Sequence, residues 1–89
     1  MLRITINDDE EVKRFILEGR MTGEWVKEVE ACWHRATADP SPPRILVELR
    51  DVRFVDEEGR KLLRLMAQSG VEMVAGDLLM RATLEEITT

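Results

Sequence analysis

The sequence contains only one cysteine, Cys32, and one histidine, His34, among its 89 residues. A single cysteine excludes an internal disulfide and argues against a cysteine-based metal site. His34 has no second histidine or cysteine at ligand spacing, so the pattern favours a helix-surface residue over a metal ligand or a member of a catalytic triad. Cys32 is interpreted as a small, buried apolar residue, not as a nucleophile.

Long apolar runs and a basic face are missing too. No apolar stretch approaches the ~20 residues that a membrane span needs, and residues 1–20 lack the basic start and apolar core of a secretory signal. We therefore expect no membrane insertion and a cytoplasmic location. The net charge of −5 disfavours nonspecific nucleic-acid binding, because phosphates need a basic face. Protein partners are expected instead.

The residues that are present are typical of a soluble globular chain. Hydrophobic residues make up 44% of the sequence and charged residues 35%, and the length predicts a single domain that spans residues 1–89. Apolar and polar residues alternate in residues 2–6, and the apolar pattern resumes in residues 12–17. This predicts an N-terminal hairpin of two strands.

Helices and apolar strands alternate after this hairpin. Residues 45–49 form a continuous apolar run, as expected of an interior strand covered on both faces. The pattern therefore predicts an α/β fold: a mixed sheet with an N-terminal antiparallel hairpin, parallel inner strands and about three helices. The further expected elements are a helix at residues 24–38 ended by a proline-rich loop, a helix at 59–67, an interior strand at 71–75, and a helix at 78–87 that Asp77 caps.

The run ILVELRDVRFVDEEGRKLL, residues 45–63, has an apolar strand, a turn and an acidic helix start in close succession. It resembles the centre of the STAS domain, the module of bacterial anti-sigma factor antagonists and of sulfate-transporter tails. In that family the strand ends in Asp-Leu, and Asp-Ser-Ser-Gly-Leu opens the next helix. Glu48 and Leu49 take the place of Asp-Leu here, and Asp56 and Gly59 stand at the ends of the signature without a gap. Upstream LEGRMTG and downstream VEMVAG are similar to further family segments, so the resemblance covers nearly the whole chain.

The sequence departs from the family at the switch serines. In antagonist members, an anti-sigma factor kinase phosphorylates the serine after the Asp, and dephosphorylation restores binding to that partner. Glu57 holds this position and Glu58 replaces the second serine, so neither can accept a phosphoryl group. Glutamate carries about −1 charge where phosphoserine carries roughly −1.5 to −2. Glu57 is therefore expected to imitate a permanently modified state only in part.

Two interpretations of the acidic run remain open. In the first, Asp56 is an N-cap, and Glu57 and Glu58 contribute ~0.3 to 1 kcal/mol each beside the positive end of the helix dipole. In the second, the acids are a surface that a partner protein recognises. Gly59 is expected to let a partner approach the backbone and to tolerate alanine. The predicted partner-binding residues are Asp56, Glu57, Glu58, Gly59 and Arg60.

A basic cluster surrounds these acids in the sequence. It has two interpretations: it grips a nucleotide phosphate or an acidic partner, or it is a solvated face neutralised by the acids. The segment GVEMVAGD lacks phosphate-loop spacing, and no nucleophile and base are paired, so we expect no cofactor, no metal and no enzymatic activity. The cluster consists of Arg50, Arg53, Arg60, Lys61 and Arg64.

The resemblance implies a non-catalytic, protein-binding regulatory module of bacterial signalling and transcription regulation. Its partner would be an anti-sigma factor or a serine kinase-like protein. The alternative is a STAS-type accessory subunit of an ABC transport complex. The family commonly continues with a further strand and helix, which the sequence lacks after Thr89. An exposed sheet edge is therefore expected, either covered by a partner or used for a weak homodimer.

Overall fold

The structure is a computed structural model that describes residues 1–9 and 11–88. Over these residues it has a four-stranded mixed sheet and three helices, which confirms the α/β prediction with its N-terminal hairpin. Glu10, in the predicted polar connection of the hairpin, and Thr89 lie outside the described residues. The elements are β1 (Leu2–Asp8), β2 (Val12–Met21), α1 (Glu24–Thr37), β3 (Arg44–Val55), α2 (Glu57–Gln68), β4 (Glu72–Ala75) and α3 (Leu78–Thr88).

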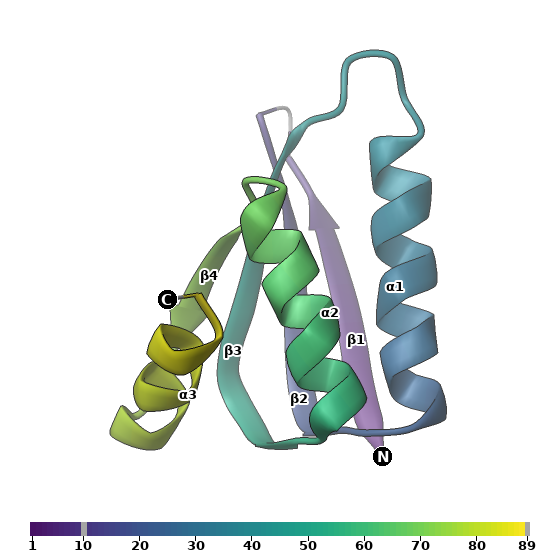
Figure 1. Cartoon of the computed structure of the whole chain (residues 1–89). Coiled ribbons are helices and arrows are strands. Elements are labelled where there is room, and N and C mark those ends of the chain that lie inside the picture. Colours follow the sequence, from purple (N-terminus) through teal and green to yellow (C-terminus); the bar gives the residue numbers. More distant parts are fainter. Residues whose placement is uncertain (10, 89) are drawn as a thin grey trace.

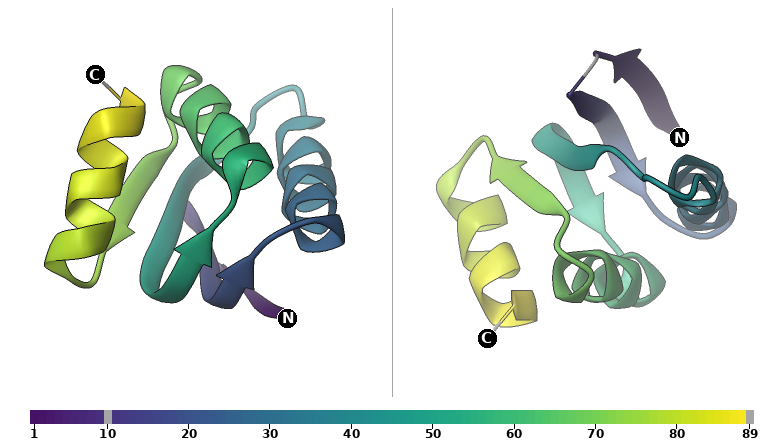
Figure 2. Two further views of the ribbon diagram at one scale, coloured as in Figure 1. Left: turned by 60° about the horizontal axis from the view of Figure 1, so that its bottom comes forward. Right: turned by 90° about the horizontal axis from the view of Figure 1, so that it is seen from above.

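The strand order in the sheet is the order in the sequence, β1-β2-β3-β4. β1 pairs with β2 antiparallel, whereas β2 with β3 and β3 with β4 are parallel. Crossovers of one hand in such a sheet place the connecting helices on the same face. Figures 1 and 2 accordingly show α1, α2 and α3 together on one side of the strands.

This arrangement corrects the prediction of strands covered on both faces. β3 is interior, but only its helix-facing side chains Ile45, Val47 and Leu49 are buried, while Leu46 and Glu48 on the other face are partly exposed. β4 is an edge strand of the described sheet, not an interior one. The continuous apolar run suggested a strand covered on both faces because it includes Leu46, but the Leu46 side chain lies on the open face of the sheet.

The open face carries charged side chains that pair across strands. Arg14 lies 3.4 Å from Glu48, and Arg44 bonds to Glu72. These pairs are solvent-exposed on at least one side, so each contributes no more than about 1 kcal/mol. The open face is therefore a hydrated surface.

The core lies between the sheet and the helices. Its fully buried side chains come from every layer, so the strands and helices cannot separate without exposing them to water. The largest are Phe15, Leu17, Met21, Val29, Val47, Leu49, Leu63 and Met66.

β2 and β3 are longer than the sequence predicts. β2 runs past residue 17 through Gly19, whose positive φ of 109° suits glycine. A Cβ atom there would lie 2.5 Å from the Met1 carbonyl oxygen, so the absence of a side chain at Gly19 lets the Met1 backbone lie close to it. β3 extends alongside to Val55, which pairs with Met21. The end of the sheet therefore lies directly before Asp56.

None of the helices in the described part of the chain is long and apolar enough to cross a membrane.

Candidate protein-binding site

Asp56 joins the beginnings of two helices. Its Oδ1 accepts a hydrogen bond from the amide of Gly59 at 2.8 Å, which caps α2 and confirms the predicted N-cap. Its Oδ2 accepts one from the amide of Gly23 at 2.9 Å, directly before α1. The amide of Asp56 itself donates to the Met21 carbonyl at 3.1 Å. The N-termini of α1 and α2 are thus held together at one carboxylate.

These hydrogen bonds also determine the charge of Asp56. The amides of Gly23 and, secondly, Gly59 lower the pKa of the carboxyl group below its ordinary value of 3.8, because both bonds favour the ionised form. Two helix N-termini add their positive dipole ends. Asp56 is therefore ionised at neutral pH, and both of its carboxylate oxygens accept hydrogen bonds from the chain itself.

Gly59 is buried, which overturns the expectation that it tolerates alanine. A Cβ atom would lie 2.7 Å from Cγ1 of Val55 and 3.0 Å from the Met21 carbonyl oxygen. Both neighbours belong to the packed end of the sheet, and a valine side chain has little freedom to move. Gly59 therefore serves the close approach of α2 to the sheet, and its backbone is not open to a partner.

Glu57 and Glu58 project from the first turn of α2 and are exposed. Glu58 forms an ion pair with Lys61 at 3.6 Å. Glu57 has no ion pair within the described residues. Of the five predicted partner-binding residues, Glu57 and Glu58 are the two that are exposed.

Three side chains of the basic cluster have partners within the chain. Arg60 lies 3.2 Å from Glu86 of α3, and Nε of Arg64 donates to the Ile87 carbonyl at 3.2 Å. Both arginines thus connect α2 to α3, while Lys61 pairs with Glu58. For Arg60 and Lys61, which pair with acids, the structure supports the neutralised face and not a phosphate grip.

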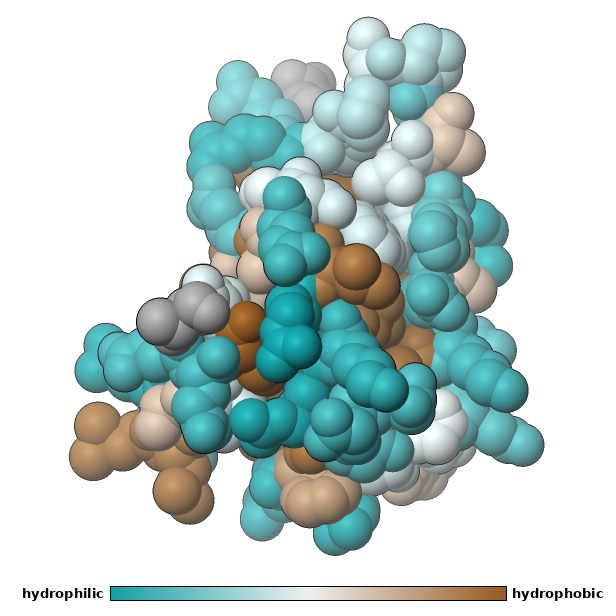
Figure 3. All heavy atoms as spheres, in the orientation of Figure 1, coloured by the Kyte–Doolittle hydropathy of each residue, from teal (hydrophilic) through white to brown (hydrophobic). Residues whose placement is uncertain are grey.

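A groove between α1 and α2 is lined by Glu58, and the sequence did not predict it. Its volume is about 300 Å³. Leu65 on its wall is 51% exposed and lies on the same side of α2 as the exposed residues Glu58 and Lys61. Figure 3 shows a hydrophobic band between the two helices. The groove is lined by Gly23, Val26, Lys27, Glu30, Glu58, Lys61, Leu62 and Leu65.

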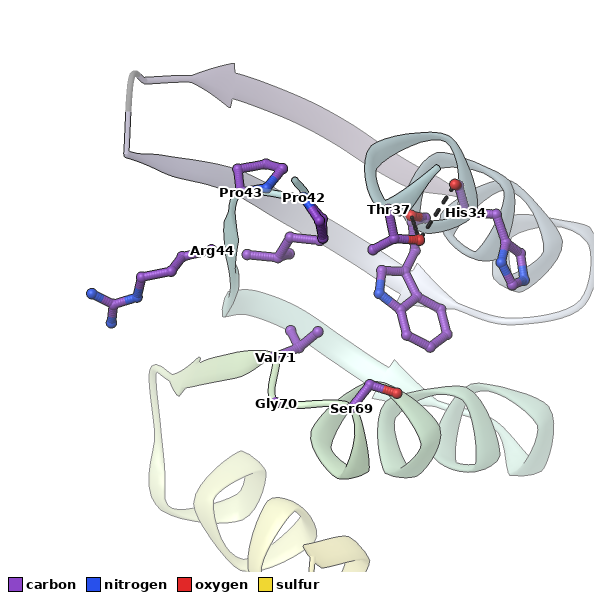
Figure 4. Close-up of a pocket in the computed structure, with 10 residues that line it drawn as sticks. His34, Thr37, Pro42, Pro43, Arg44, Ser69, Gly70 and Val71 are labelled. Carbon is purple, nitrogen blue, oxygen red and sulfur yellow. Dashed lines mark hydrogen bonds between the residues drawn. The ribbon is translucent and has the colours of Figure 1, made fainter. Parts of the chain in front are cut away.

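The opposite end of the same two helices holds a second cavity of about 390 Å³ (Figure 4). Trp33 lines it, and its Nε1 is buried without a hydrogen-bond partner in the described chain. His34 is exposed, as predicted, and lies 3.9 Å from Glu30. Thr37 donates to the Trp33 carbonyl at 3.0 Å. The Thr37 hydrogen bond stabilises the last turn of α1.

Residues 1–9 and 11–88 contain no group of three or more His, Cys, Asp or Glu side chains that could hold a metal ion. No protein-family model matches the chain, and no curated protein matches it. The geometry at the start of α2 is therefore the basis for a functional assignment.

Proposed function

We propose that the protein is a non-catalytic regulatory module of the STAS type that binds another protein through the start of α2. The observation that carries this proposal is the fixed turn at Asp56, which leaves Glu57 and Glu58 exposed at the start of α2, where Glu58 lines the groove between α1 and α2. In the bacterial antagonists that the sequence resembles, this turn carries the switch serine. Here it carries a permanent negative charge.

The partner surface that fits is partly basic and partly apolar. Exposed carboxylates attract a basic patch and raise the association rate, while burial of Leu65 would supply apolar area. An anti-sigma factor or a serine kinase-like protein in the bacterial cytoplasm is the class that the resemblance implies. Since Glu57 cannot be phosphorylated, the interaction would not be switched at this position.

Quantitative affinity capture from the source cell tests the proposal. The bait is the wild-type chain, compared with the charge reversal Glu57→Lys/Glu58→Lys. The matched control is Asp39→Lys/Asp51→Lys, which makes the same change of net charge on exposed residues outside α1 and α2. We expect an anti-sigma factor or kinase-like protein that the wild type and the control retain and the α2 variant loses.

The same experiment separates the alternative. An ABC-type ATPase as the retained protein would favour the accessory-subunit function instead. A partner that both variants retain equally would show that the start of α2 is not the binding surface.

A further inference from the structure

The outer edge of β1 is open. In the described part of the chain β2 is the only strand that pairs with β1. The amide of Arg20 donates to the Met1 carbonyl at 2.9 Å, and bonded residues alternate along an antiparallel ladder. Odd-numbered residues of β1 therefore bond to β2. The backbone N–H and C=O groups of Leu2, Ile4 and Ile6 point outward and can pair with another strand.

A groove of about 400 Å³ runs between this edge and α1, and we call it the β1-edge groove. Leu2 and Ile4 form its sheet side, and Glu24, Trp25 and Glu28 form its helix side. The Trp25 side chain is 37% exposed, away from the buried stripe of α1. Figures 1 and 2 show β1 at the end of the sheet with α1 beside it. The groove is thus open along the unpaired edge.

Glu24 and Glu28 make the helix side acidic. Neither forms an ion pair within residues 1–9 and 11–88, and no basic residue lines the groove. The two acids are one helical turn apart, about 6 Å along the axis. Side chains on one face of a strand repeat every ~6.6 to 6.8 Å. The two acids therefore match two successive same-face residues of an added strand.

We propose that the β1-edge groove binds an extended peptide segment of a partner protein with lysine or arginine at every second position. The segment adds to the sheet beside β1, as in known strand-addition complexes. Its aliphatic stems lie against Trp25, and its cationic heads reach Glu24 and Glu28. This site lies on α1 and β1 and is independent of the proposed function at the start of α2.

A second copy of the chain fits the same edge less well. The helix-facing residues of β1 are Leu2, Ile4 and Ile6, so a second β1 strand would bring no cation to the acids. Two copies would also place two acidic helix sides together, in a chain of net charge −5.

The probe is a peptide of alternating threonine and lysine, seven residues long like β1. Calorimetry measures its affinity for the full chain, and the control peptide has glutamate for each lysine. We expect binding of the lysine peptide alone. Peptides N-methylated only at the lysines or only at the threonines test the backbone pairing: one of the two should lose binding, because an added strand uses the amides of one set. Equal binding of both would overturn strand addition.

Protein variants locate the site. Glu24→Lys/Glu28→Lys should bind the lysine peptide about tenfold more weakly at low salt, with a smaller difference at high salt. Asp39→Lys/Asp51→Lys makes the same change of net charge on exposed residues outside both proposed sites and should bind as the wild type does. Equal loss in both variants would mean nonspecific charge attraction and would overturn the proposal.

Amide NMR shifts on peptide addition provide a second readout. They should be largest in β1 and at the Trp25 indole, and shifts confined to other elements would overturn the proposal. Light scattering tests for self-association. The edge would be assigned to a second copy of the chain if three results came together. The wild type would form a dimer, Glu24→Lys/Glu28→Lys would strengthen that dimer, and the peptide would fail to dissociate it.

Discussion

The Asp56 carboxylate accepts a hydrogen bond from the amide of Gly23, 33 residues earlier in the sequence, at 2.9 Å. The same side chain caps its own helix through Gly59. One residue therefore holds the starts of α1 and α2 together and determines where Glu57 and Glu58 stand.

Asp56→Ala should lower the free energy of unfolding by about 2 kcal/mol, since loss of one N-cap costs ~0.5 to 2 kcal/mol and this side chain bonds amides at two helix starts. Urea unfolding followed by circular dichroism measures the change. Asp39→Ala is the control, because Asp39 lies exposed in a loop. Equal stability of the two variants would mean that the two bonds contribute nothing net.

Acid should remove the contribution of Asp56. Its pKa is lowered in the folded state by the amides of Gly23 and Gly59, so its stabilising effect is fully present above the ordinary value of 3.8 and is lost as the pH falls through the folded value. The stability difference between wild type and Asp56→Asn should therefore be largest near neutral pH and shrink below pH 3.8. Parallel pH profiles from pH 7 to pH 2 would contradict this.

Gly59→Ala should destabilise the fold by about 1 to 3 kcal/mol, because overpacking against Val55 and the Met21 carbonyl outweighs the gain in helix propensity. Thermal unfolding gives the sign directly. A rise in the midpoint temperature would mean that α2 moves away from the sheet without cost.

Glu57→Ser/Glu58→Ser recreates the serines of the resembled family. Loss of two acids near the dipole should cost on the order of 0.6 to 2 kcal/mol, which leaves the protein folded. Incubation with a cognate anti-sigma kinase should then phosphorylate the variant at residue 57 and not the wild type, as mass spectrometry would detect.

Partner affinity of this double variant distinguishes two roles of the acids. Tighter binding would mean that they imitate the modified state, and weaker binding, more so at low salt, would mean that they are contacts. Unchanged affinity at both salts, with the expected loss of stability, would leave them as helix-stabilising residues alone.

Two leucines of α2 should separate packing from binding. Leu63 is fully buried, and Leu63→Ala should cost about 2 to 5 kcal/mol of stability. Leu65 is 51% exposed, and Leu65→Ala should change stability little while it weakens partner binding in the groove. Denaturant unfolding and partner titration of both variants test this, and normal binding by Leu65→Ala would exclude the groove.

Local patterns in the sequence predicted most of the elements. Alternation in the first strands, helical spacing in α1 and α2, and the caps Asp56 and Asp77 are encoded within a few residues, and the structure has all of them. The single domain and the partner-binding role stay predictions.

The errors concern contacts between distant residues. Gly59 is required by Val55 and the Met21 carbonyl, which belong to two different strands. The extension of β2 depends on Gly19, a residue that usually ends a strand. The groove beside Leu65 is lined by residues of both α1 and α2, and no local pattern encodes how two helices lie against each other.

The agreement between strand order and sequence order has a consequence for synthesis on the ribosome. Each strand pairs with the strand made just before it, so the growing chain can extend the sheet one strand at a time. No strand has to wait for a distant one or insert between two others. We expect the β1-β2 hairpin to acquire protease resistance once α1, β3 and α2 have emerged, with α3 docking last.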